Sequence, residues 1–164
     1  MTADLPRLLF QPMSLALAEV MAGWEYEAAY GLYNHAPEKR PHVVEAMMDP
    51  ANSFSSISDA SSTLLGFCCF GSNGQVTGGD YSVEAVDIGM GIDPKRTGRG
   101  FGHPIVGAVL NFADETSGPG LRRVTIAGFN ARAIRVWSRQ GFAVTQDFER
   151  PGDGRAFVVL TRQR

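Results

Sequence analysis

The segment Asp87–Gly102 reads DIGMGIDPKRTGRGFG and joins an alternating strand pattern to a basic, glycine-rich turn. Pro104 follows and suits the first turn of a helix, because it lacks the amide donor that would go unpaired there. Amides next to glycines can converge on one point, and a helix N-terminus adds partial positive charge. The segment predicts a phosphate-binding turn between a strand and a helix. An ordinary glycine turn with solvated basic residues explains the same pattern equally well.

Two familiar phosphate loops do not match this segment. The sequence contains no GxxxxGK[ST], and the glycines at 98, 100 and 102, followed by His103, do not give GxGxxG. Neither a P-loop nor a dinucleotide-binding fold is indicated.

A second motif follows at Asn130–Phe142, NARAIRVWSRQGF. Asn130 suits a helix N-cap, Gly141 a helix end and Phe142 the start of a strand. With the first segment, this motif resembles the two coenzyme A signatures of the GNAT acetyltransferases. Thr97 departs from their Gln/Arg-x-x-Gly-x-Gly/Ala pattern, and Trp137 departs from Tyr-x-x-x-Gly-Phe. The resemblance covers roughly residues 63–148.

The resemblance implies an α/β protein of GNAT fold. Its central sheet would be mixed but mostly antiparallel, with about six or seven strands flanked by helices. The alternation of strand and helix patterns along the chain favours the same class. We expect one domain over residues 1–164, because the length and the 44% hydrophobic content suit a single core.

Composition limits the partners and the compartment. The formal net charge is −2 and the isoelectric point is about 5.9, which argue against nucleic acid as a partner. Cys68 and Cys69 are too few and too close for a disulfide framework, and the three histidines lack metal-ligand spacing. No secretory leader or membrane span is indicated. We expect a cytoplasmic protein, monomeric or homodimeric, with no metal site and no membrane contact.

The resemblance implies acetyl-CoA as the donor and places its contacts in both motifs. The carbonyl of the thioester would be polarised by a backbone amide near Ile92. The residues expected to contact acetyl-CoA are Met90, Ile92, Thr97, Gly98, Arg99, Gly100, Phe101, Gly102, Asn130, Ala133 and Trp137.

Acetyl transfer to an amine also needs a base. Asp87 and Glu84 are the candidates, acting directly or through water, and Asp87 is preferred because it shares a strand face with Gly89 and Gly91. A carboxylate that is simply hydrogen-bonded or solvated is an equally good reading. Thr125 stands where protein N-terminal acetylases of the superfamily often carry a glutamate.

Trp137 stands where many members of the family have the tyrosine thought to protonate the CoA thiolate. An indole N–H donates a hydrogen bond but is too weak an acid to give up its proton. Trp137 could instead orient the sulfur or pack on the pantetheine, and water could protonate the thiolate.

An aromatic series comprises Trp24, Tyr26, Tyr30 and Tyr33. The spacing of the tyrosines puts their side chains on one helical face, which fits ordinary packing or the wall of an acceptor-binding cleft. The expected function is acetyl transfer from acetyl-CoA to a primary amine, by direct attack in a ternary complex. The alternative is a non-catalytic acyl-CoA-binding or regulatory module of the same fold.

Overall fold

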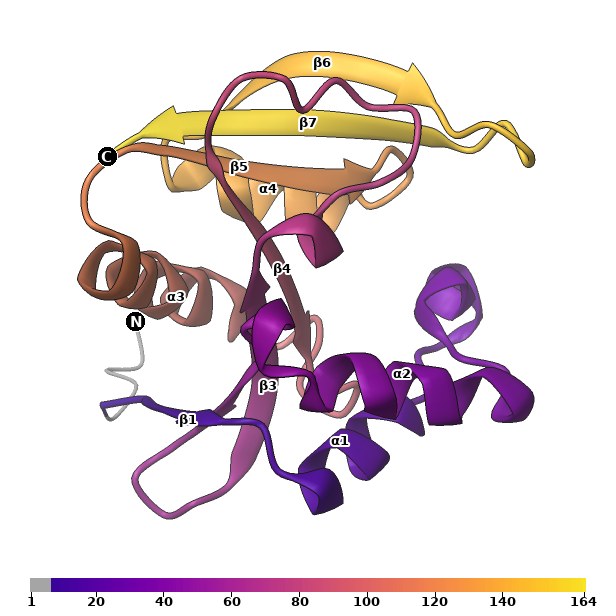
Figure 1. Cartoon of the computed structure of the whole chain (residues 1–164), viewed down its shortest axis with the longest axis vertical. Coiled ribbons are helices and arrows are strands. Elements are labelled where there is room, and N and C mark those ends of the chain that lie inside the picture. The colour runs from indigo at the N-terminus through magenta and orange to yellow at the C-terminus, as the bar shows by residue number, and fades with distance from the viewer. Residues whose placement is uncertain (1–6) are drawn as a thin grey trace.

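The computed structural model describes residues 7–164, and its centre is one seven-stranded sheet (Figure 1). The strand order is β1-β2-β3-β4-β5-β7-β6, and every neighbouring pair is antiparallel except β4 and β5. The strands are β1 (Leu9–Pro12), β2 (Ser55–Ser58), β3 (Leu64–Phe70), β4 (Val86–Ile92), β5 (Leu121–Ala127), β6 (Ala143–Glu149) and β7 (Ala156–Gln163).

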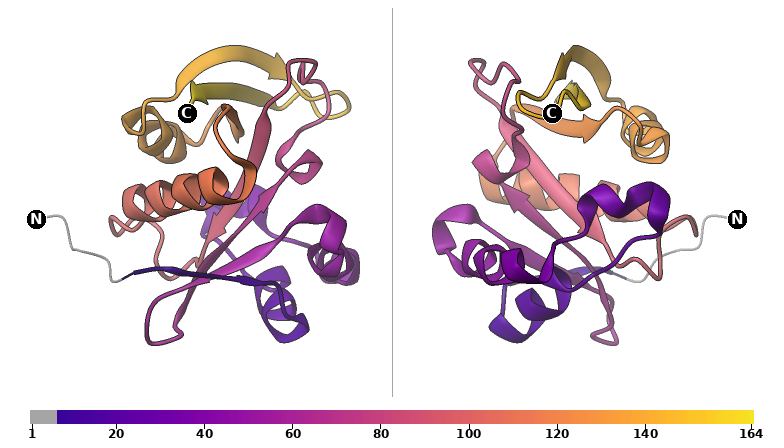
Figure 2. Two further views of the ribbon diagram at one scale, coloured as in Figure 1. Left: turned by 60° about the vertical axis from the view of Figure 1, so that its left-hand side comes forward. Right: turned by 90° about the vertical axis from the view of Figure 1, so that its right-hand side faces the viewer.

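Four α-helices cover the two faces of the sheet. Helices α3 and α4 lie on one face, and α1 and α2 lie on the other (Figure 2). They are α1 (Leu15–Ala22), α2 (Arg40–Met48), α3 (Gly102–Ser117) and α4 (Ala131–Arg139), with short 3-10 turns η1 (Ala28–Tyr33), η2 (Pro37–Lys39), η3 (Pro50–Asn52) and η4 (Ser72–Gly74). None of the helices in residues 7–164 is long and apolar enough to cross a membrane.

The main core lies between the sheet and helices α3 and α4. The side chains of Ile105, Val109 and Leu110 on α3 are fully buried against the sheet. They repeat at the spacing of one helix face, which is the pattern expected of a helix that covers a sheet. A smaller cluster under α1 and α2 contains Ala18 and Met21.

The sheet opens in its middle, between β4 and β5. Strand β4 pairs with β3 over five residue positions, but with β5 only at Val86–Arg122 and Asp87–Arg123. Beyond Asp87 the two parallel strands diverge, which Figure 1 shows as β4 running steeply away from β5. This divergence leaves backbone groups of the last part of β4 without a strand partner on the β5 side.

Most of the expected elements are confirmed. Asn130 caps α4 as expected, because its side-chain oxygen accepts a hydrogen bond from the Ala133 amide at 3.0 Å, and Ser14 caps α1 in a similar way. The α/β class and the mostly antiparallel sheet are also as expected. Strand β4 begins at Val86, so the candidate base Glu84 precedes it in the chain.

The prediction that three tyrosines share one helical face is wrong, because Tyr26 lies outside the helical turn. Only residues 28–33 are helical, as a short 3-10 turn that contains Tyr30 and Tyr33. Asn34 explains the difference, because its side-chain oxygen accepts from the Tyr26 amide at 2.7 Å and its side-chain nitrogen donates to the Tyr26 carbonyl. Asparagine often forms such local bonds in competition with a helix.

Candidate active site

The end of β4 turns unpaired backbone groups toward the opening of the sheet. The Asp93 amide donates to the Leu65 carbonyl on β3 at 2.8 Å, and hydrogen-bonding direction alternates along a strand. The backbone groups of Met90 and Ile92 therefore face β5, where no strand meets them. The Ile92 carbonyl accepts from the Tyr26 hydroxyl at 2.8 Å, so the Ile92 amide is left to face the opening.

The turn after β4 has the shape of an anion-binding loop. Gly98 and Gly100 have φ angles of +72° and +83°, a region that residues with side chains rarely adopt. The Thr97 hydroxyl donates to the Pro94 carbonyl at 3.0 Å, so this side chain closes the turn rather than pointing toward a ligand. A loop of this kind can direct successive amides to one side.

Helix α3 starts directly after the turn, and its first amides lack side-chain caps. No side chain caps the helix at Phe101, and Pro104 has no amide to offer. A Cβ on Gly102 would lie 3.2 Å from a methyl of Val136, so the glycine also lets α3 pack closely on α4. The free amides at 102 and 103 and the helix dipole both favour an anion here.

Positive charge gathers around the turn. Lys95 and Arg99 are exposed, and Arg96 is half-buried over the ring of Phe101 at 5.6 Å. The Nε atom of Arg96 is buried without a hydrogen-bond partner in residues 7–164, but it forms an ion pair with the Asp93 carboxylate at 3.8 Å. Full charges and free amides fit a diphosphate group better than a purely structural turn.

Arg132 is a functional candidate that the motif comparison missed. It comes from the first turn of α4, and its Nη1 lies 3.0 Å from the position of a Cβ on Gly98. Its guanidinium also stacks on the ring of Tyr30 at 4.2 Å. Arg132 thereby connects the glycine turn with the aromatic residues of η1, and no local sequence pattern reveals that contact.

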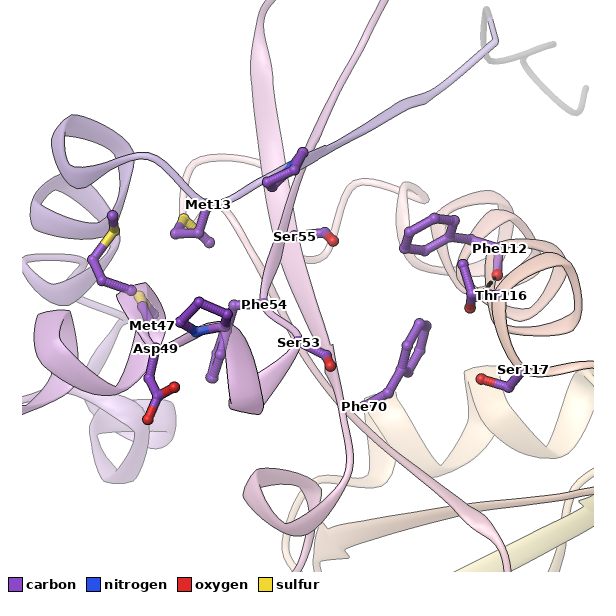
Figure 3. Close-up of a pocket in the computed structure, with 13 residues that line it drawn as sticks. Met13, Met47, Asp49, Ser53, Phe54, Ser55, Phe70, Phe112, Thr116 and Ser117 are labelled. Atoms are coloured by element: carbon purple, nitrogen blue, oxygen red, sulfur yellow. Dashed lines mark hydrogen bonds between the residues drawn. The ribbon is translucent and has the colours of Figure 1, made fainter.

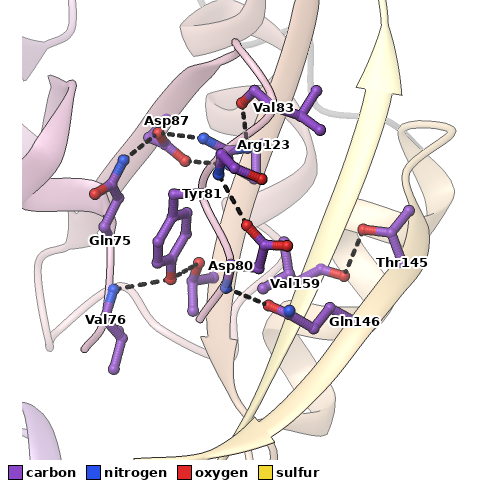
Figure 4. A network of polar contacts seen from close by, with 12 residues as sticks. Gln75, Val76, Asp80, Tyr81, Val83, Asp87, Arg123, Thr145, Gln146 and Val159 are labelled. Carbon is purple, nitrogen blue, oxygen red and sulfur yellow. Dashed lines mark hydrogen bonds and ion pairs between the residues drawn. The ribbon is translucent and has the colours of Figure 1, made fainter. Parts of the chain in front are cut away.

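Asp87 lies in a buried polar network, as Figure 4 shows. Arg123 donates to both carboxylate oxygens, at 2.6 and 2.8 Å, and Gln75 donates to one of them at 2.8 Å. The Arg123 guanidinium stacks on Tyr81 at 5.0 Å and donates to the Val83 carbonyl. Both oxygens of Asp87 are occupied, and the residue is 3% exposed. These contacts argue against the expected role as general base and show a carboxylate that joins β4 to β5 where they last pair.

Glu84 also does not fit the expected role of base. It is exposed in the segment before β4, at the end where β4 and β5 still pair.

The face of β4 that Asp87 shares with Gly89 and Gly91 is filled by side chains of the protein itself. A Cβ on Gly91 would lie 2.5 Å from the ring of Phe67, and one on Gly89 would lie 2.7 Å from the sulfur of Cys69. Both glycines are needed for packing inside the chain.

Three tyrosines and Phe129 form an aromatic wall at the open end of the sheet. The ring of Tyr33 lies 6.2 Å from that of Tyr26 and 6.0 Å from that of Phe129, and the rings of Tyr30 and Phe129 are 5.8 Å apart. Tyr26 contacts the end of β4, whereas Phe129 directly follows β5. The wall therefore spans both sides of the opening.

The polar ends of this wall are tied to the protein. Asn130 donates from Nδ2 to the Tyr33 hydroxyl at 3.0 Å, while its Oδ1 accepts from the Ala133 amide. Burial raises the pKa of both Tyr26 and Tyr33, so both phenols stay protonated at neutral pH. The Ala133 amide is therefore used by the cap of α4.

The two tryptophans pack within the hydrophobic clusters of the protein. Trp24 packs on Phe67 with 6.2 Å between ring centroids and belongs to the small core cluster, apart from the tyrosines. Trp137 is 4% exposed and packs edge-on against Phe142 at 4.9 Å. Trp137 is thus part of the main core beneath the opening.

A separate open groove of about 470 Å³ lies near the edge of the sheet (Figure 3). Met47, Phe54, Phe70 and Phe112 line it, together with several hydroxyl groups. It contains none of the residues expected to bind acetyl-CoA or an acceptor. In residues 7–164, no three His, Cys, Asp or Glu side chains gather in a way that would hold a metal ion.

The comparison with protein families is decisive. A sequence model described as "Acetyltransferase (GNAT) family" matches residues 19–142, which is most of the chain. The chain belongs to the GNAT family. No curated protein sequence matches it.

Solved structures agree with this GNAT assignment. A chimera of the spermidine N-acetyltransferase SpeG from Vibrio cholerae and hSSAT has a TM-score of 0.72 at 15% identity, with 95% of each chain covered. A putative GNAT-family acetyltransferase from Bordetella pertussis has a TM-score of 0.69 at 24% identity, covering 99% of this chain and 98% of its own. The putative acetyltransferase yncA from Salmonella typhimurium, solved with acetyl-CoA, has a TM-score of 0.63 at 17% identity, covering 95% and 93%. At these identities, the likeness establishes the fold.

Proposed function

We propose that this protein is an acetyl-CoA-dependent N-acetyltransferase that acetylates a primary amine, either a small molecule or a protein N-terminus. The amine attacks the bound thioester directly in a ternary complex. Family membership supports acetyl transfer. The opening between β4 and β5 is the observation that supports placing the reaction there.

The opening and the glycine turn are suited to different parts of acetyl-CoA. The diphosphate would lie against the amides between Gly98 and His103, with Lys95, Arg96 and Arg99 around it. The pantetheine arm carries two amides, which can pair with the backbone of Met90 as a strand would. The protein thus offers hydrogen-bond donors where acetyl-CoA has hydrogen-bond acceptors.

The reaction needs little side-chain chemistry at the carbonyl carbon. The Ile92 amide is free to donate to the thioester oxygen, which becomes negative as the amine attacks. Because neither Asp87 nor Glu84 is suitably placed, we propose that water carries the proton away from the amine. The aromatic wall would border the acceptor, with Tyr26, Tyr30 and Tyr33 as its contact residues.

Calorimetry with acetyl-CoA and with CoA, followed by a thiol-release assay, tests the proposed function. The assay would use a thiol-reactive dye and a panel of polyamines, amino acid amides and short peptides with free N-termini. We expect saturable binding of both acetyl-CoA and CoA. We also expect thiol release that depends on the presence of one class of amine. Acetyl-CoA without an amine gives the hydrolysis background.

Two outcomes would contradict the proposal in different ways. No binding of either nucleotide at millimolar concentration would remove both the enzyme and the acyl-CoA-binding module. Binding without thiol release across the panel would favour the non-catalytic module. That alternative is suggested by Trp137, which stands in place of the family's tyrosine.

A further inference from the structure

The leaving thiolate of CoA needs a proton, and α4 does not supply one. Position 137 carries a buried tryptophan packed on Phe142, and an indole N–H does not ionise in this pH range. Any phenol that reaches the opening must therefore come from another element. Within residues 7–164, the segment that contains η1 brings three tyrosines to the end of the opening, whereas the hydroxyl of Tyr81 is already held by the Val76 amide and Thr125.

Tyr33 lies between the two strands that diverge. Its ring contacts Tyr26, which is bonded to the end of β4, and Phe129, which follows β5. Its hydroxyl is held at 3.0 Å from Asn130, at the start of α4. The phenol is thus anchored at the mouth of the opening, beside Tyr26, whose hydroxyl donates to the Ile92 carbonyl.

The hydroxyl proton of Tyr33 is free to be donated. The Asn130 amide is fixed in orientation, because its Oδ1 accepts from the Ala133 amide, so its Nδ2 must donate to the phenol oxygen. Tyr33 therefore accepts in this bond, and Asn130 is the one hydrogen-bond partner of its hydroxyl among residues 7–164. Tyr26 differs, because its proton is already given to the Ile92 carbonyl.

The surroundings of Tyr33 suit an acid that ionises briefly. Burial and, to a lesser extent, the neighbouring Tyr30 raise its pKa, while the hydrogen bond from Asn130 and the charge of Arg155 oppose that rise. The phenol stays protonated before the reaction, and Asn130 stabilises the phenolate that forms when the proton leaves. A transient phenolate is stabilised by a hydrogen-bond donor to its oxygen, which Asn130 provides here.

We propose that Tyr33 donates its hydroxyl proton to the sulfur of CoA as the thioester breaks. The amine nitrogen bonds to the carbonyl carbon, and the carbon–sulfur bond breaks with its electron pair on sulfur. The Tyr33 proton completes the CoA thiol, and water returns to the phenolate the proton released by the new amide. Tyr33 thus supplies a phenol from η1 where the family's tyrosine on α4 is absent. The inference rests on the proposed function, since it assigns a role within that reaction.

The test compares the wild-type protein with Tyr33→Phe, each saturated with CoA. The ultraviolet absorbance of the thiolate, followed across a pH titration, gives the pKa of the bound CoA thiol. A hydroxyl that donates to sulfur stabilises the thiolate, so we expect this pKa to rise by about one unit or more in the variant. CoA affinity at pH 6, where the thiol is neutral in both proteins, should change less than about twofold. This measurement needs no acceptor and no turnover.

A turnover arm uses the amine that gives the most thiol release in the panel. We expect kcat of Tyr33→Phe to fall about tenfold or more with KM for acetyl-CoA nearly unchanged, and to lose its dependence on an ionisation at high pH. Failure of the whole panel would count against the proposed function, whereas the thiol titration would still decide whether Tyr33 contacts the sulfur.

Two matched variants keep the test specific. Tyr26→Phe removes a hydroxyl whose proton is engaged by Ile92, so it should leave the pKa of the bound thiol unchanged. Tyr30→Phe removes the hydroxyl three residues earlier on the same 3-10 turn and should do the same. Identical thiol titrations for wild type and Tyr33→Phe would overturn the proposal, as would a shift produced by Tyr30→Phe instead.

Discussion

Replacing Asp87 by alanine should lower the free energy of unfolding by about 3–5 kcal/mol, the usual cost of removing one partner of a buried ion pair. The variant leaves the guanidinium of Arg123 without its carboxylate, and Arg123 is only 4% exposed. The pair also joins β4 to β5 at the last position where they meet. Chemical denaturation of the purified variant measures the change.

An exposed ion pair of the same chemistry serves as the control. Arg150 and Asp153 pair in the turn between β6 and β7, where their side chains are 32% and 45% exposed. Asp153→Ala should leave the unfolding midpoint nearly unchanged, because exposed pairs contribute little. Equal stability losses for the two variants would contradict the buried network.

The isosteric variant Asp87→Asn separates stability from catalysis. It keeps the shape of the side chain and one hydrogen-bond acceptor but removes the charge. Measured well below its unfolding temperature, it should retain turnover within several-fold of the wild type. A loss of a hundredfold or more, which is typical when a general base is removed, would restore the base role that the contacts of Asp87 argue against.

Replacing Gly100 by valine should lower the affinity for acetyl-CoA about a hundredfold. Gly100 has a φ of +83°, which a β-branched residue adopts only with strain, and a Cβ there meets no atom within 4 Å. The backbone of the turn must therefore change its conformation, and at least two amides would lose their hydrogen bonds to the diphosphate. Each of these charge-assisted hydrogen bonds contributes about 1.5–3 kcal/mol. Calorimetry with acetyl-CoA measures the loss.

The control for this variant is Gly152→Val. Gly152 also has a positive φ, +102°, and open space around its Cβ position, but it lies in the turn between β6 and β7. The same strain is introduced away from the glycine turn, so the affinity for acetyl-CoA should stay within about twofold. Equal losses for both variants would mean that general destabilisation, rather than loss of the anion site, explains the effect.

Local patterns in the sequence were enough to predict the elements around the glycine turn. The strand, the glycine turn and the start of α3 follow from residues 87–104, and the cap of α4 follows from Asn130. Each depends on neighbours in the chain, such as an alternating strand face or a capping side chain. The motif comparison then adds the fold, which the family match and the solved structures confirm.

The polar contacts across the sheet could not be predicted in this way. The choice between a base and a simply hydrogen-bonded Asp87 stays open in the sequence, because its partner Arg123 is 36 residues away and on the next strand. Tyr33 and Asn130 are 97 residues apart and meet only because the sheet brings η1 to the start of α4. No pattern of alternation or spacing encodes such pairs, so the roles of individual polar side chains needed the structure.

A crystal structure of the protein with acetyl-CoA tests the central claim most directly. We predict the diphosphate on the amides between Gly98 and His103, the pantetheine between β4 and β5, and the acetyl oxygen on the Ile92 amide. The hydroxyl of Tyr33 should lie within hydrogen-bond distance of the sulfur. Acetyl-CoA bound elsewhere, for example in the groove beside Met47 and Phe112, would contradict the account.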